Sequence, residues 1–92
     1  MEMGMSTLKA MVSMLDTIGK KYKSEYVCTF LSRDVLVEYY WNEIKTYEIV
    51  LNDQLELRSV IRIDSEIENK GPTRVSVDVQ SFLNSIFIYI SK

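Results

Sequence analysis

The sequence predicts a single α+β domain, in which an N-terminal helix, a meandering antiparallel sheet of four to five strands and a C-terminal helix follow one another. The chain has 92 residues, which is the size of one domain. Its hydrophobic period is helical at the start and changes to two after about residue 24. Short polar breaks separate the later runs, and short connections favour antiparallel neighbours. We therefore expect one domain over residues 1–92, with residues 1–5 as a frayed tail.

The first element is expected to be a helix over residues 7–18. Ser6 is a suitable N-cap, and Gly19 is placed to end the helix. Three lysines follow the glycine and put positive charge beside the negative helix end. The apolar residues that share one helical face are Leu8, Met11, Val12, Leu15 and Ile18.

Five runs with a period of two are expected to form the strands. Asn52 and Asp53 are expected to make a two-residue hairpin turn. In the fourth run Ser59 interrupts the apolar alternation and indicates a bulge or a bend. The alternation of that run places Leu55, Leu57, Ile61 and Ile63 on the inward side. The five runs cover residues 26–31, 34–41, 46–51, 55–64 and 74–79.

The last fifteen residues fit two structures. Asp78 is a suitable cap for a helix with one apolar face. The run 86–90 also has the composition of a strand. The longer helical spacing and the polar start at Gln80 and Ser81 favour the helix. Its apolar face would hold Phe82, Leu83, Ile86, Phe87 and Ile90.

Composition argues against an enzyme. Histidine is absent, and Cys28 is the only cysteine, so the usual general base and most zinc ligands are missing. Three glycines cannot build phosphate-binding loops, and no nucleophile motif is present. We therefore expect no catalytic residue, no metal and no cofactor. One cysteine fits a reducing compartment, and no apolar run spans a membrane, which predicts a cytoplasmic location in its own cell or a host cell.

Negative charge is concentrated in the middle of the chain. Residues 34–68 carry nine acidic and three basic side chains, whereas the whole chain has a net charge of −2. An acidic sheet face attracts basic partners and repels phosphate, so direct nucleic-acid binding is not expected. An ordinary solvated face is the alternative explanation. The acids expected on the outward face are Asp34, Glu38, Glu48 and Glu56.

Apolar side chains accompany these acids. If Tyr39 and Trp41 point inward, then Leu36, Tyr40 and Val50 lie outward beside the acids. Tyrosine is favoured at interface hot spots, although large aromatic residues also fill the cores of small domains. With Ile88 and Tyr89, these residues form more apolar surface than a monomer of this size usually shows. A partner protein or a second copy is therefore expected to cover them.

Two functions follow from these features. The first is a small non-catalytic inhibitor that binds a protein with a basic, nucleic-acid-type site, as phage anti-defence and immunity proteins do. Its acids would stand in for phosphates, with Tyr40 as an anchor. The second is a structural or regulatory homo-oligomer without an inhibitory role, joined through the fifth strand or the last helix. Nucleic-acid binding through Lys20, Lys21, Lys23 and Arg33 is a weaker third possibility.

Overall fold

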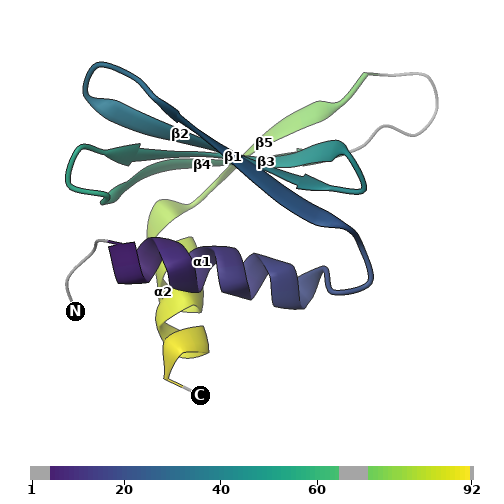
Figure 1. The fold of residues 1–92 in the computed structure, drawn as a ribbon, viewed down its shortest axis with the longest axis horizontal. Coiled ribbons are helices and arrows are strands. Elements are labelled where there is room, and N and C mark those ends of the chain that lie inside the picture. The colour runs from purple at the N-terminus through teal and green to yellow at the C-terminus, as the bar shows by residue number, and fades with distance from the viewer. Residues whose placement is uncertain (1–4, 65–70, 92) are drawn as a thin grey trace.

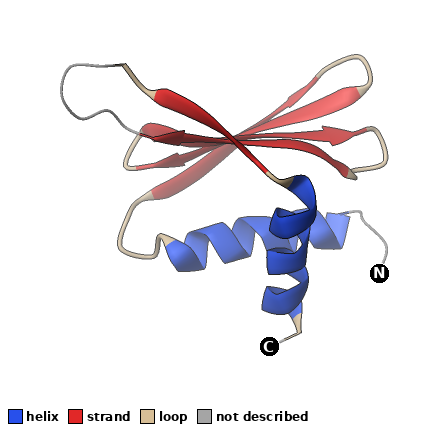
Figure 2. Cartoon of the chain, turned by 180° about the vertical axis from the view of Figure 1, so that it is seen from behind, coloured by secondary structure: helices blue, strands red, loops and turns tan. Residues whose placement is uncertain are grey.

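A computed structural model describes residues 5–64 and 71–91, which form a five-stranded antiparallel sheet with two helices on one face (Figure 1). Seen from behind, both helices again lie on the same side of the sheet (Figure 2). This arrangement confirms the predicted small α+β domain. The elements are α1 Met5–Ile18, β1 Ser24–Phe30, β2 Asp34–Trp41, β3 Ile44–Asn52, β4 Leu57–Asp64, β5 Thr73–Val77 and α2 Val79–Ile90.

The strands pair in the order of the sequence, β1-β2-β3-β4-β5. The connections from β1 to β2, from β2 to β3 and from β3 to β4 are short, as in a meander. Asn42 and Glu43 join β2 to β3, and their φ angles of 52° and 67° are those of a type I′ turn. This turn twists in the same sense as the strands. The pairing of β2 with β3 shifts by one residue close to it, because Tyr40 pairs with Lys45 and Tyr39 with Tyr47.

Helix α1 begins earlier than expected. It includes Met5 and Ser6, so Ser6 is not the N-cap and Met5 is not part of a frayed tail. Residues 1–4 lie outside the described part of the chain. The apolar face is as expected, with Met11 and Leu15 buried against the sheet and Ile18 largely exposed at the helix end.

Gly19 ends α1 for a different reason from the one expected. It does not adopt a left-handed conformation, but its backbone lies against the indole ring of Trp41. A Cβ added at Gly19 would lie 2.7 Å from Trp41 Cζ2, which is too close for real atoms. The glycine therefore lets the end of α1 approach the sheet.

The turn predicted at Asn52 and Asp53 is longer than two residues. Strand β3 ends at Asn52, and β4 begins at Leu57. The side-chain oxygen of Asn52 accepts hydrogen bonds from the backbone of Gln54 and Glu56, both at 2.9 Å. Leu55 is left-handed, with φ 62°. An asparagine that bonds the backbone ahead of it closes this loop without a glycine.

The bulge predicted near Ser59 is present and reverses the inward side of β4. Leu57 pairs with Leu51, but Ser59 pairs with Val50, which leaves Arg58 as the extra residue. After the bulge Val60 is the buried residue, so the prediction that Ile61 and Ile63 point inward is wrong. One inserted residue shifts the alternation by one position and turns every later side chain to the other face.

Helix α2 is confirmed, and the alternative of a final strand is wrong. The carboxylate of its N-cap, Asp78, accepts from the backbone of Ser81 at 2.9 Å, which lowers the pKa of Asp78. The Tyr89 hydroxyl shares a hydrogen bond of 2.8 Å with Ser13 of α1. Phe82 and Ile86 are the buried residues of this helix.

The core lies between the two helices and the inner face of the sheet. Tyr39 is wholly buried there, and its hydroxyl donates to the Asp16 carboxylate of α1. A buried hydroxyl needs such an acceptor, so this bond fixes α1 on the sheet. The buried apolar residues are Met11, Met14, Leu15, Val35, Val37, Tyr39, Ile49, Leu51, Val60, Phe82 and Ile86.

Candidate protein-binding face

The sheet face that points away from the helices is not covered by any described element (Figure 1). We call it the outer face. Its residues alternate with the buried ones along the strands, because successive side chains point to opposite sides. The outer face is defined by Val27, Leu36, Glu38, Tyr40, Lys45, Glu48, Val50, Ser59, Ile61, Arg74 and Ser76.

Glu38 and Glu48 lie directly opposite each other on β2 and β3. Like charges in this position are unfavourable unless a cation separates them. Lys45 supplies that cation, with Nζ 2.6 Å from Glu38 and 3.1 Å from Glu48. The two carboxylates raise the pKa of Lys45 to about 12. These two acids therefore point outward as predicted, but a lysine bridges them.

Arg74 of β5 adds a second cation to this cluster. Its guanidinium donates to Glu48 and is the largest cause of the lowered pKa of that carboxyl. The Glu48 side chain is 19% exposed and the Arg74 side chain 57% exposed. Two acids and two bases therefore form one neutral network in the middle of the outer face, and Arg74 is its most exposed member.

The other two predicted acids are not in this network. Asp34, at the start of β2, lies 3.6 Å from Arg58, the bulge residue of β4. Glu56 is in the β3–β4 loop and accepts from the side-chain amide of Asn52 at 2.8 Å. The outer face therefore brings together only Glu38 and Glu48, and it is less acidic than the sequence indicates.

Apolar side chains surround the Glu38–Glu48 pair. Leu36 and Val50 pair with each other on one side of it, and Tyr40 follows on β2. All three point outward as predicted, but they are partly buried, so they offer less apolar surface than the sequence indicates. Ile61 pairs with Glu48 from β4 and joins this group. The alternation of apolar residues predicts Ile61 on the inward side, because the bulge that reverses β4 is signalled in the sequence only by Ser59.

The helices place the remaining predicted apolar residues elsewhere. Ile88 is 61% exposed on α2. Figure 1 shows α2 on the side of the sheet opposite to the outer face. Tyr89 is bonded to α1. The apolar residues predicted to be exposed are thus divided between two sides of the molecule.

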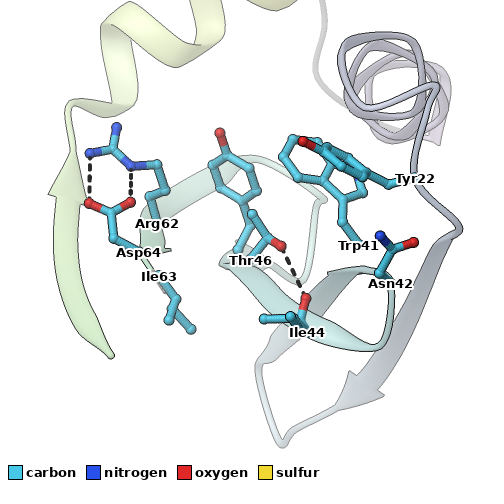
Figure 3. A pocket seen from close by; sticks show the side chains of 9 residues that line it. Tyr22, Trp41, Asn42, Ile44, Thr46, Arg62, Ile63 and Asp64 are labelled. Atoms are coloured by element: carbon cyan, nitrogen blue, oxygen red, sulfur yellow. Dashed lines mark hydrogen bonds and ion pairs between the residues drawn. The ribbon is translucent and has the colours of Figure 1, made fainter. Parts of the chain in front are cut away.

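A cavity of about 530 Å³ lies at the end of the sheet near the β2–β3 turn. Figure 3 shows Arg62 and Asp64 on one side of it and Trp41 with Tyr22 on the other. Arg62 Nε donates to Asp64 at 2.8 Å, and the rings of Tyr22 and Trp41 are 5.5 Å apart. Arg62 and Asp64 thus pair with each other and the rings pack together, whereas the indole N–H of Trp41 is buried without a hydrogen-bond partner among the described residues.

The basic residues are separated. Lys20, Lys21 and Lys23 lie between α1 and β1, whereas Arg33 lies in the β1–β2 connection at the other end of β1. Lys23 is also 3.3 Å from Glu25, and Lys21 lies over the Tyr22 ring. The fold does not gather these four cations into one patch.

The described residues contain no group of three or more cysteine, aspartate or glutamate side chains that could hold a metal ion. Burial raises the pKa of the Cys28 thiol, which keeps it protonated near neutral pH. Neither described helix has the length and apolar character needed to cross a membrane. Comparison of the chain with protein-family models, curated proteins and solved structures finds no match.

Proposed function

We propose that this is a small non-catalytic protein that binds another protein through the outer face and blocks a basic site on it. The observation that carries the proposal is the uncovered group of Leu36, Tyr40, Val50 and Ile61 around two carboxylates. Interfaces commonly combine aromatic and aliphatic anchors with a few polar groups that fix orientation.

The charged network gives the site its preference for a basic partner. Glu38 and Glu48 are about one-fifth exposed, so part of their hydration is already lost in the free protein. A lysine or arginine of the partner would compete with the exposed Arg74 for Glu48. The basic residue of the partner would then pair with the partly desolvated carboxylate of Glu48. That basic residue would no longer be free to bind nucleic acid.

This mechanism is tested with the protein captured by the wild-type chain. The affinity of that protein is measured for the wild type, Arg74→Ala, Glu48→Gln and Val50→Ser, together with displacement of a labelled DNA duplex from it. Arg74→Ala should bind about as tightly as the wild type or more tightly, because the competing cation is removed. Glu48→Gln and Val50→Ser should each weaken binding by about tenfold, which corresponds to about 1.4 kcal/mol.

The control is Ile44→Ser, which removes an apolar side chain that is 56% exposed next to the β2–β3 turn. Ile44 pairs with Trp41, which lies on the helix side of the sheet, so this change leaves the outer face intact. It should leave the affinity unchanged. Loss of binding in Arg74→Ala with retention in Glu48→Gln would contradict the basic-partner mechanism. Unchanged binding in Val50→Ser would contradict the use of the outer face.

Self-assembly without an inhibitory role is the alternative. It was expected at the fifth strand or the last helix, but β5 has five residues, follows Pro72 and carries Arg74. These features disfavour pairing with another strand. Capture of no partner, with a dimer in light scattering, would favour self-assembly, and the first strand is then the surface to test.

A further inference from the structure

The two edges of the sheet differ in how they are protected. Strand β5 is short, follows a proline and carries an arginine, which are common devices against edge-to-edge pairing. Strand β1 has seven residues and contains neither proline nor lysine. Its pairing with β2 is regular over Ser24–Phe30, and no described strand covers its other edge. The free backbone groups of β1 are therefore open to another strand.

The side chains along β1 are also unusually exposed. Phe30 is 81% exposed, Tyr26 is 51% exposed and Val27 is 49% exposed. An aromatic side chain contributes about 150–250 Å² when it is fully buried. Scaled by their exposed fractions, Phe30 and Tyr26 in two copies therefore offer roughly 400–660 Å². Val27, Leu31 and the strand backbone add to this, toward the roughly 1,200 Å² of a small specific interface. Tyr26 and Phe30 also border an apolar cavity of about 510 Å³ on the helix side of β1.

We propose that a second copy of this chain pairs antiparallel with β1, centred on Val27. This register overlaps all seven residues of the strand. It places Val27 opposite its own copy, Tyr26 opposite Cys28, and Glu25 opposite Thr29. Glu25 is the only charged residue in β1, so no like charges face each other. Both copies keep their helices on the same side of one continuous sheet.

The pairing does not rest on the proposed function, because it uses the edge of β1 and leaves Leu36, Glu48 and Val50 uncovered. It would place two outer faces side by side in one assembly. Failure of the dimer therefore says nothing about binding of a partner protein, and the two proposals are tested by separate variants.

Cross-linking tests the register directly. A disulfide needs Cα atoms about 4.4–6.8 Å apart, which is the spacing of residues directly opposite in a sheet. The full chain with Val27→Cys and Cys28→Ser should form a covalent dimer on mild oxidation. The matched chain with Thr29→Cys and Cys28→Ser should not, because residue 29 faces residue 25. Equal cross-linking of both chains, or of the second alone, would overturn the proposed pairing.

Light scattering tests the dimer without a covalent bond. The wild-type chain should change from monomer to dimer between about 1 μM and about 1 mM, the range of a weak association. Val27→Lys should raise the dissociation constant by about tenfold or more, because two lysines would face each other. The control, Ser76→Lys on β5, should leave it unchanged. A wild-type chain that stays monomeric throughout, or a Val27→Lys dimer of unchanged affinity, would overturn the proposal.

Discussion

Trp41 fits beside the end of α1 only because residue 19 has no side chain. Its ring is held between Tyr22, Tyr39 and Tyr47, with ring centroids 5.5, 5.9 and 6.2 Å away, so it has little room to move. A methyl group at residue 19 would have to displace that ring or the helix end.

Gly19→Ala should therefore destabilise the fold by about 1–3 kcal/mol, the usual cost of overpacking a filled core. Urea unfolding followed by the fluorescence of Trp41, the only tryptophan, measures this change. Gly71→Ala is the matched control, because an added Cβ there meets nothing within 4 Å. Equal stability of the two variants would show that Trp41 does not lie against Gly19 as described.

At the scale of an element, the bulge in β4 decides which side chains enter the core. Val60→Ala should cost about 2 kcal/mol, because two buried methyl groups are lost and a cavity remains. Ile61→Ala removes a larger side chain but should cost less than about 1 kcal/mol, since Ile61 lies on the uncovered face. Unfolding in urea ranks the two variants. The reverse order would mean that β4 alternates without a bulge.

The network of Glu38, Lys45, Glu48 and Arg74 links three strands and predicts a pH dependence. The pKa of Glu48 is lowered below its ordinary value of 4.5, mainly by Arg74. A carboxyl with a lowered pKa stabilises the folded state above its unfolded pKa, and this contribution is lost as pH falls through the folded pKa. The stability advantage of the wild type over Glu48→Gln should therefore be constant near neutral pH and shrink below pH 4.5.

Urea unfolding of both chains between pH 7 and pH 3 measures this difference. Glu43→Gln in the β2–β3 turn provides the matched loss of one negative charge outside the network. If the wild type kept the same stability advantage over Glu48→Gln down to pH 3, the ion pairs of Glu48 would not contribute as proposed.

At the scale of the whole molecule, local patterns were enough to predict the fold class, the strand order implied by short connections, and α2 with its Asp78 cap. They were not enough where one residue changes the register. A strict alternation has no place for the extra residue Arg58, so it predicts Ile61 inward where Val60 is the buried residue. The acids were placed correctly along β2 and β3, but their neutralisation depends on Lys45 and Arg74. Arg74 is 26 residues from Glu48 and meets it only through the pairing of β4 with β5.

The two edge strands differ in how they are protected, and this difference predicts the rates of amide hydrogen exchange along the sheet. The central strands β2, β3 and β4 are paired on both sides, so most of their amides should exchange only when the molecule opens widely. Strands β1 and β5 are each paired on one side and should exchange faster by local opening.

Hydrogen exchange measured by NMR at rising protein concentration separates the two edges. A second copy on β1 would slow the outward amides of Ser24–Phe30 and leave those of Thr73–Val77 unchanged. Slowing at β5 alone would instead place the contact between copies on the edge that Pro72 and Arg74 disfavour.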